Sequence, residues 1–520
     1  MLKRFLRSTS GNFALTLAAG SPALLLGVGF SVDVTNLMSA KADLQNALDA
    51  AVMASARPGA TEIPRLETFE AFFSTNVAGK QLLRDPVATL ETDETVASIR
   101  NRGVAQSHVD LKFMPFFNID PLITVSSTAY ESRKNVEVAL VLDNTGSMGA
   151  DRMRALRDAA NSLVDTLRGM QGGESARQVR AALVPFVTAV NIKGEGFKQE
   201  WVDTTGRNPL NGVQFDKIDG GPADHMELFD RLGVAWKGCV EARAAPHNLD
   251  DTPPDPSRPE TLFVPYFAPD EPGPAANPGN DAARFNNSYL DDPAPNTSST
   301  SSTAVVDQQR AEQKSIAKYN RTTPRRIAET PSLTNGPNRS CATPIAPLTQ
   351  DLASLKTAID KMTFWNGSGT NVSEGLAWGR RVLSPEQPYD QGQPFSDPLV
   401  SKTVVVFTDG TNEVFGSSGT FNKSDYGAYA FLADGRAGTT DKGRAVTQVN
   451  TWTQEMCTAL KAQDVQIFTI LLGADSGANR TLYSRCASKP EYYFPTNDAA
   501  KLKGIFGSIA DTIAQLQFTN

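Results

Sequence analysis

Three loops in this sequence carry side chains with the hard oxygen atoms that Mg²⁺ prefers as ligands. The first loop directly follows the mainly apolar run 136–142, and the third follows the mainly apolar run 403–407. The donors are carboxylates and hydroxyls: Asp143, Thr145 and Ser147 in the first loop, Thr370 in the second and Asp409 in the third. Mg²⁺ takes near-octahedral oxygen coordination and commonly keeps waters in some positions. These residues predict a site for a divalent cation, with Mg²⁺ as the first choice and Mn²⁺ or Ca²⁺ as alternatives.

The predicted site is better suited to binding than to catalysis. It would leave a coordination position open, which an acidic side chain of a protein partner could fill. A metal-dependent hydrolase would need a general base beside the ion, and the loops offer only Glu413. The chain has neither a GxSxG elbow nor an HExxH helix, so we expect no enzymatic activity. The alternative is that these Asp, Ser and Thr side chains serve only as helix caps and turn formers.

Alternating strands and helices must position these loops. Strands are predicted at 136–142, 180–187, 403–407, 465–471 and 492–494, with helices at about 152–168, 352–362, 372–383, 445–462 and 501–516. This alternation predicts an α/β fold with a doubly wound, mostly parallel sheet. Such sheets place their sites at the carboxyl ends of strands, where the first and third loops would meet.

A long segment interrupts this pattern. Residues 191–345 are rich in Pro, Asp, Asn, Ser and Thr, and the run 297–303 contains only Ser and Thr. Such a composition buries too little apolar surface to order itself well, so we interpret the segment as a loop-rich insertion in one domain, 136–520. Its aromatic residues are either anchors for a partner or pins that hold the insertion to its own domain, and the second role is favoured. They are Trp236, Tyr266 and Phe267.

The first residues predict where the protein resides. Residues 1–11 carry Lys3, Arg4 and Arg7, and the uncharged run 12–32 is long enough to cross a bilayer as a helix, which takes about 20 residues. Positive charge beside a span stays in the cytoplasm. We therefore predict a cytoplasmic N-terminus at 1–11, a single transmembrane helix at 12–32 and an extracytoplasmic remainder. A cleaved signal peptide is the alternative.

Two segments connect this span to the α/β domain. Residues 33–56 repeat Leu37, Leu44 and Ala51 at intervals of seven, which predicts an amphipathic helix that continues the span. This helix would pack on a partner helix or, more simply, on the next segment of its own chain. Residues 57–135 combine a helical segment with alternating strand patterns and predict a small α+β stalk.

The chain has four cysteines, and none has a spacing suited to zinc. An extracytoplasmic location favours disulfides. We expect one bridge between Cys239 and Cys341, closing a loop of about a hundred residues around the insertion. A second bridge, between Cys457 and Cys486, would join the last strand–helix units. Other pairings and free thiols remain alternatives.

Charge argues against a nucleic-acid partner. The chain has 50 basic and 57 acidic residues and a net charge of −7. No basic block with interleaved aromatic residues occurs in it. Proteins that bind nucleic acids usually present such a basic surface, so we expect no nucleic-acid binding.

The three loops resemble the metal-ion-dependent adhesion site of the von Willebrand factor A (vWA) family. The family pattern DxSxS, then Thr, then Asp-Gly corresponds here to Asp143-Asn144-Thr145-Gly146-Ser147, Thr370 and Asp409-Gly410. Thr145 stands where Ser is commoner, and it also supplies a hydroxyl. The resemblance implies a vWA or Rossmann-like fold, with Ser147 and Thr370 contacting the ion and Asp143 and Asp409 acting directly or through water.

Other segments are similar to the TadE/TadG group associated with Tad (Flp) pilus assembly. They are Gly11-Asn12-Phe13-Ala14, Asp33, 44–51, 236–243 and 266–271. The resemblance implies a single-pass protein of the bacterial cytoplasmic (inner) membrane with its bulk in the periplasm. It implies pilus or envelope assembly components as partners. The alternative function is a structural envelope tether whose metal site is non-functional or purely structural.

Overall fold

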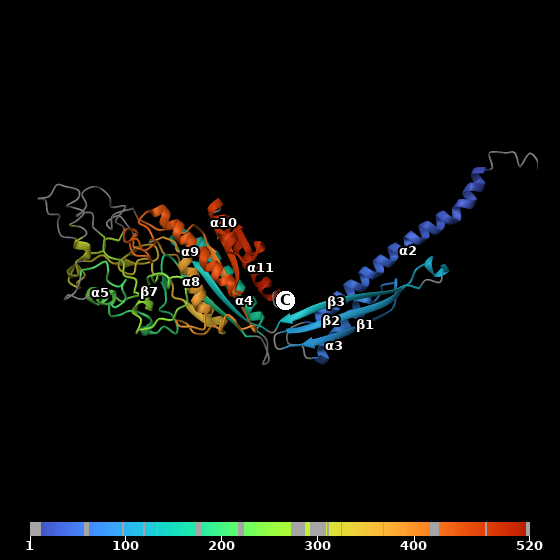
Figure 1. Cartoon of the computed structure of the whole chain (residues 1–520), viewed down its shortest axis with the longest axis horizontal. Coiled ribbons are helices and arrows are strands. Elements are labelled where there is room, and N and C mark those ends of the chain that lie inside the picture. The colour runs from blue at the N-terminus through green and yellow to red at the C-terminus, as the bar shows by residue number, and fades with distance from the viewer. Residues whose placement is uncertain are drawn as a thin grey trace, which may run out of the picture. The chain divides into compact units, whose positions relative to one another are not determined.

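The computed structural model describes residues 12–56, 62–95, 98–117, 120–132, 134–171, 178–216, 223–271, 287–291, 308, 311–323, 325–367, 369–416, 426–473 and 476–515. The predicted cytoplasmic segment and the Ser/Thr run of the insertion lie outside these residues. The chain divides into two compact units, of which the first consists mainly of the residues up to Lys134 and the second mainly of those from Asn135 to Ala514 (Figure 1). Each unit has its own sheet and its own hydrophobic core.

The first unit packs a long helix on a three-stranded antiparallel sheet. Its elements are α2 (Asn12–Ser55), α3 (Glu62–Val77), β1 (Leu83–Glu94), β2 (Ser98–Val109) and β3 (Leu122–Ser132). The strands pair in the order β1-β2-β3. The second half of α2 buries Leu44 and Leu48 in one cluster with Phe69 of α3 and Ala105 of β2. The amphipathic helix thus packs on its own chain, which confirms the simpler of the two predicted arrangements.

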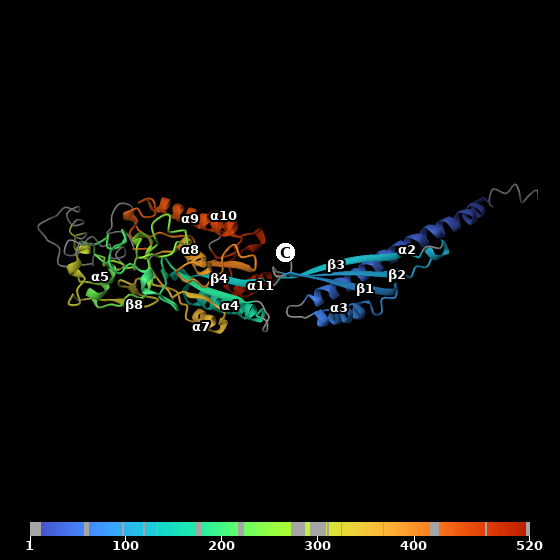
Figure 2. The same cartoon turned by 60° about the horizontal axis from the view of Figure 1, so that its bottom comes forward.

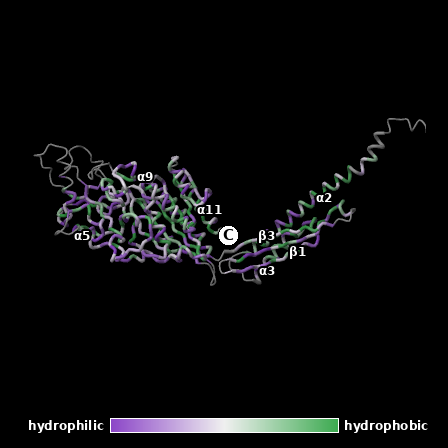
Figure 3. Tube along the Cα trace, viewed as in Figure 1, coloured by the Kyte–Doolittle hydropathy of each residue, from purple (hydrophilic) through white to green (hydrophobic). Residues whose placement is uncertain are grey.

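Several large apolar side chains in the first half of α2 are exposed. Leu24 and Leu25 are 67% and 69% exposed, and Figure 3 shows apolar residues continuing along α2 beyond the end of the sheet. Within the described part of the chain, one helical stretch, Ala18–Ser55, is long and apolar enough to cross a membrane. A membrane anchor and a signal sequence both meet this criterion.

A close approach between α2 and β2 depends on Gly103. A Cβ atom added there would lie 2.5 Å from Val52 Cγ2 and 2.8 Å from Leu48 Cδ1. We expect Gly103→Val to destabilise the first unit by about 1–3 kcal/mol, because the added side chain must displace the helix. Hydrogen exchange of the β2 amides should become faster. Arg102→Val, at an exposed position of the same strand, is the matched control, and unchanged exchange in Gly103→Val would contradict the expectation.

The second unit contains an eight-stranded mixed sheet. Five strands are parallel and pair in the order β13-β12-β11-β4-β5. They are β4 (Asn135–Asp143), β5 (Val179–Phe186), β11 (Val400–Thr408), β12 (Gln466–Leu472) and β13 (Tyr493–Thr496). Three short antiparallel strands that were not predicted extend it beyond β5: β6 (Val190–Asn191), β7 (Cys239–Val240) and β10 (Ala346–Thr349).

Helices cover both faces of this sheet (Figure 2). One face packs against α4 (Gly149–Gly169), α7 (Leu352–Asp360) and α11 (Leu502–Gln515). The other face packs against α8 (Val372–Leu383), α9 (Lys442–Ala462) and α10 (Gly477–Cys486). Along β4, Val138, Leu140 and Leu142 point to the first layer and Ala139 and Val141 to the second, as the two-residue period of a strand requires. The predicted α/β class with helices on both faces is confirmed.

The described part of the insertion is well packed, so the expectation of a poorly ordered segment is wrong for these residues. Its short elements include α5 (His225–Leu232), β8 (Ala328–Glu329) and β9 (Thr334–Asn335). Large aromatic rings join the core of the second unit, because a few such rings bury much apolar area where aliphatic residues are scarce. Phe263 lies 4.8 Å from Trp378 of α8, measured between ring centroids. Trp236, Tyr266 and Phe267 are also buried, so they pin the insertion to its own domain, as favoured.

Both disulfides occur at the predicted pairs. Cys239 is bonded to Cys341 and Cys457 to Cys486. The first bridge spans 102 residues of sequence and the second spans 29. The second bridge joins α9 to the end of α10 and lies in the core of the second unit.

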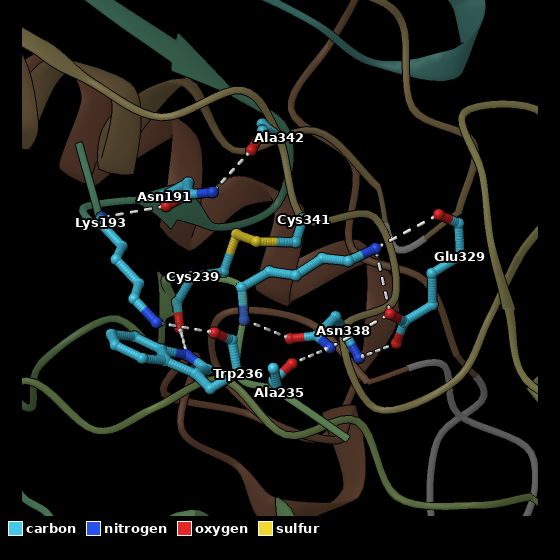
Figure 4. The surroundings of a disulfide bond; sticks show 10 residues. Asn191, Lys193, Ala235, Trp236, Cys239, Glu329, Asn338, Cys341 and Ala342 are labelled. Carbon is cyan, nitrogen blue, oxygen red and sulfur yellow. Dashed lines mark hydrogen bonds and ion pairs between the residues drawn. A yellow bond between two sulfur atoms is a disulfide. The ribbon is translucent and has the colours of Figure 1, made fainter. Parts of the chain in front are cut away.

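Hydrogen bonds hold the segments on either side of the first disulfide (Figure 4). Trp236 Nε1 donates to the carbonyl oxygen of Cys239 at 2.8 Å. Asn338, three residues before Cys341, donates from Nδ2 to the carbonyl oxygen of Ala235 at 3.0 Å. The segments that carry Cys239 and Cys341 are therefore joined by a hydrogen bond as well as by the covalent bridge.

Candidate metal site at the carboxyl edge of the sheet

Two central strands of the sheet bring the two predicted carboxylates to one edge. β4 and β11 pair in parallel with Leu142 opposite Phe407, so Asp143 ends β4 beside Thr408, the last residue of β11. Asp409 follows at once. Both strands are buried along most of their length, which fixes their register because a slip would expose apolar residues. The sheet therefore places the first and third loops next to each other, as predicted.

Hydrogen bonds connect four of the five predicted ligands, namely Asp143, Thr145, Ser147 and Asp409. Ser147 Oγ donates to Asp409 Oδ1 at 2.7 Å, and the hydroxyls of Thr145 and Ser147 lie 2.9 Å apart. Asp143 Oδ1 accepts from the backbone N–H of Thr145 at 2.8 Å. The two hydroxyls and the Asp409 carboxylate therefore form one continuous group of oxygens, and the Asp143 carboxylate shapes the turn that presents them.

Thr370, in the second loop, lines a cavity that the first loop also lines. It directly precedes Asn371, the N-cap of α8, whose side chain accepts from the backbone N–H of Glu374. The backbones of Thr370 and Glu413 exchange two hydrogen bonds, at 3.0 and 2.9 Å. Thr370, Thr145 and Ser147 line one cavity of about 630 Å³. The second loop thus shares a cavity with the first.

Two supporting residues were not predicted. Arg152 of α4 donates from Nη1 to Asp409 Oδ2 at 3.0 Å, and Thr408 donates from Oγ1 to Asp143 Oδ2 at 2.7 Å. The sequence could have indicated Thr408 as a supporting residue, since it stands between a predicted strand and the predicted ligand Asp409. No local pattern indicated Arg152, because its contact with Asp409 joins residues 257 positions apart.

Burial and mutual repulsion make the two carboxylates hard to ionise together. Asp143 is fully buried, and burial with the nearby charge of Asp409 raises the pKa of Asp143 to about 7. Burial also raises the pKa of Asp409, while the hydrogen bond that it accepts from Ser147 and the charge of Arg152 oppose the rise. A divalent cation between these groups would stabilise both ionised forms.

The donor set fits a hard divalent cation. Among the residues that the structure describes, no three His, Cys, Asp or Glu side chains gather as a metal-binding group. A cation here would therefore depend on hydroxyl oxygens beside two carboxylates. Oxygen-only sets of low charge suit Mg²⁺, which binds proteins through one or two carboxylates and keeps several waters. The residues present therefore fit the predicted ion.

The insertion supplies one wall of the cavity beside these oxygens. Ser332, Leu333 and Thr334 line it, together with Asn366 and Phe415. Asn366 Nδ2 donates to the carbonyl oxygen of Ser332 at 3.0 Å, and Thr334 Oγ1 donates to the carbonyl oxygen of Asn366. Leu333 is 59% exposed at this wall. A molecule that reached the oxygen group would also contact the insertion.

Comparison with protein families finds a match at the N-terminus. Residues 11–57 match the family model described as putative Flp pilus-assembly TadE/G-like. This range contains all of α2 and is a small part of the chain. A comparison with curated proteins finds no significant match.

Similar solved structures include proximal thread matrix protein 1 from the mussel byssus, at 12% identity and a TM-score of 0.29, covering 74% of this chain and 47% of that chain. The pilus adhesin SpaC from Lactobacillus rhamnosus GG is 12% identical at a TM-score of 0.32, covering 84% and 35%. The vWF domain of the type V pili tip protein Mfa5 from Porphyromonas gingivalis is also 12% identical at 0.32, covering 75% and 98%. The chain thus spans less than half the length of the first two proteins. TM-scores this low do not establish a shared fold.

Proposed function

We propose that this chain is an envelope protein that binds a protein partner through a divalent cation, in a vWA-type domain held at the membrane by α2. The observation that carries the proposal is the oxygen group at the carboxyl edge of the sheet. Ser147 Oγ lies 2.7 Å from Asp409 and 2.9 Å from Thr145 Oγ1, and Asp143 stands behind the same turn.

Asp143, Thr145, Ser147, Thr370 and Asp409 would hold the ion. When bound, it would offer a positively charged position with open coordination, which an acidic side chain of the partner could fill. The cavity of about 630 Å³ beside Thr145, Ser147 and Thr370 leaves room for such a side chain. This is a binding role, and we propose no enzymatic activity.

The proposed cellular role is Tad (Flp) pilus assembly or adhesion at the bacterial inner membrane, with the second unit outside the cytoplasm. The match of residues 11–57 to the TadE/G-like family supports this role. The exposed apolar side chains of α2, among them Leu24 and Leu25, suit a bilayer. Two disulfides suit an oxidising compartment.

A structural tether is the second candidate function, and one contact favours it. Arg152 already places a guanidinium 3.0 Å from Asp409 Oδ2. The positive charge of Arg152 could stabilise the loops in place of a metal ion. In that case the protein would connect envelope layers, and its partner would bind without any divalent cation.

To test the proposal, the native gene is replaced in its bacterium by a gene that encodes the Asp409→Ala variant. This strain is compared with a strain from which the gene is deleted. We expect both strains to lose surface pili in electron micrographs, because the variant lacks a central ligand of the site. Immunoblots of the membrane fraction should show the variant at wild-type level. Asp165→Ala, on the exposed side of α4, is the control and should keep its pili.

Other outcomes separate the candidates. Normal pili in Asp409→Ala beside a deletion strain that lacks them would contradict the metal-dependent mechanism and favour the tether. Normal pili in the deletion strain would contradict the pilus role itself.

A further inference from the structure

The turn between β2 and β3 returns to α2 and is fixed there by Asp33. The Asp33 carboxylate accepts three backbone hydrogen bonds, from the N–H groups of Lys112 at 3.0 Å, Phe113 at 2.7 Å and Met114 at 2.7 Å. Met114 is the first residue of the short 3₁₀ helix Met114–Phe117. The carboxylate of Asp33, which belongs to α2, therefore caps the N-terminus of this 3₁₀ helix. Asp33 itself is buried. This contact therefore positions the turn along the axis of α2.

Phe113 lies against α2 at Gly29. A Cβ atom added to Gly29 would come within 2.5 Å of the Phe113 ring, so the missing side chain provides the flat surface on which the ring packs. Gly29 and Asp33 are four residues apart and share one face of the helix. The turn therefore covers one helical turn of α2, from the end of its uncharged run to the first charged residue.

This position lies within the predicted membrane span. Gly29 comes three residues before Val32, the last residue of the uncharged run, which corresponds to about 4.5 Å along a helix. The neighbouring side chains on α2 are apolar and exposed, including Leu25 and Val28. If α2 crosses the bilayer through residue 32, the Phe113 ring lies at the depth of the outer lipid leaflet.

The turn adds its own exposed apolar surface to that of the helix. Phe113 is 37% exposed although it packs on Gly29, and Leu122, the first residue of β3, is 52% exposed. Large apolar groups gathered at one end of a small domain usually mark a contact surface. Phe113, through its contact with Gly29, borders the exposed apolar side chains of α2, for which lipid is the expected surroundings. The acyl chains of the lipid would therefore cover the apolar groups of the turn as well as those of α2.

We propose that the part of the β2–β3 turn around Phe113 dips into the outer leaflet of the membrane, with Phe113 as its lipid-contacting side chain. The three-stranded sheet would then rest on the membrane surface. Aromatic rings are favoured at this boundary, because their apolar faces enter the acyl region. Asp33 is then a positioning residue that sets the depth of the turn. This proposal rests on the proposed membrane anchoring by α2 and adds a second contact with the bilayer.

Tryptophan fluorescence of the full chain tests this arrangement. The chain is reconstituted in phosphatidylcholine vesicles whose acyl chains are plain or brominated, since bromine quenches only tryptophans that it contacts. The native tryptophans (Trp201, Trp236, Trp365, Trp378 and Trp452) all follow residue 200, so the unsubstituted chain provides the baseline. Leu25→Trp reports on the span, and Phe113→Trp reports on the turn.

Phe72→Trp is the matched control. Phe72 of α3 is 38% exposed, close to the 37% of Phe113. It lies on a helix that packs on the second half of α2. We expect bromine to remove most of the added emission of Leu25→Trp and Phe113→Trp and none of that of Phe72→Trp. Bromines near the headgroups should quench Phe113→Trp more strongly than bromines near the chain ends.

The outcomes distinguish this proposal from the anchoring on which it rests. If Leu25→Trp is quenched and Phe113→Trp behaves like Phe72→Trp, the turn does not enter the membrane, while the anchor stands. If Leu25→Trp is not quenched, α2 is not in the bilayer and both ideas are wrong. Adding Asp33→Ala to Phe113→Trp should reduce its quenching, and the same change should leave Leu25→Trp unaffected.

Discussion

Replacing Glu137 by alanine is expected to lower the unfolding free energy of the second unit by about 3–5 kcal/mol, the cost of leaving buried charges unpaired. Glu137 is fully buried on β4 and forms ion pairs with Lys402 of β11 and Arg180 of β5. It also accepts from the backbone N–H of Gln393 at 3.1 Å. Without this carboxylate, two cations would face each other in the interior.

Lys402 makes this loss severe. Burial lowers the pKa of Lys402, and the charge of Glu137 opposes that effect. The Lys402 ammonium also donates to the carbonyl oxygen of Leu383 at 2.7 Å, so it is held in place after the substitution. Lys402→Met should cost less than Glu137→Ala, because Glu137 would keep Arg180 as its partner.

Chemical denaturation followed by tryptophan fluorescence measures this effect in the second unit alone, since the five tryptophans occur only there. Asp151→Ala is the control, because Asp151 and its partner Arg154 are exposed and surface pairs contribute about 1 kcal/mol or less. A loss of less than about 1 kcal/mol in Glu137→Ala would contradict the account of this buried network.

The second large effect is a pH dependence of cation binding. Burial and the charge of Asp409 raise the pKa of Asp143 to about 7 in the metal-free protein. A carboxylate must lose its proton to bind a metal ion. We therefore expect the affinity for Mg²⁺ to be constant above pH 7 and to fall about tenfold for each pH unit below it.

The stability of the metal-free protein should follow the opposite trend. The pKa of Asp143 in the folded state lies above its ordinary value of 3.8, so between these values the folded protein holds a proton that the unfolded chain has released. Its contribution to stability is present at low pH and is lost as the pH rises through about 7. Added Mg²⁺ should restore stability at high pH, because it binds only the folded site.

Titrations at several pH values, in buffers with different ionisation enthalpies, measure both the affinity and the proton released. Near pH 6 about one proton should leave for each ion bound. Asp143→Asn should bind more weakly and release no proton. An affinity that stays constant from about pH 5 to about pH 8 would show that Asp143 does not exchange its proton for the ion.

Local sequence patterns predicted the parts of the fold that depend on continuous burial. The runs before Asp143 and Asp409 contain enough β-branched and apolar residues to specify central strands. Adjacent parallel strands then bring the loops to one edge. For this reason Asp143, Thr145, Ser147 and Asp409 could be grouped before any coordinates were known.

The remaining features depend on contacts between distant residues or on very short elements. β6 and β7 have two residues each, too few to show a period. Arg152 and Asp33 meet partners that lie far away along the chain. In the insertion, a few aromatic side chains determine the packing. The overall composition of the segment, which is mostly polar, does not reveal their contribution.

Calorimetric titration of Mg²⁺, Mn²⁺ and Ca²⁺ into the purified full chain, beside Asp409→Ala and the control Asp165→Ala, tests the central claim most directly. We expect saturable binding of one ion to the wild type and the control, and no binding to Asp409→Ala, because Asp409 accepts from Ser147 at the centre of the oxygen group. Folded wild-type protein that binds none of these ions would contradict the metal site. Undiminished binding to Asp409→Ala would place the ion elsewhere.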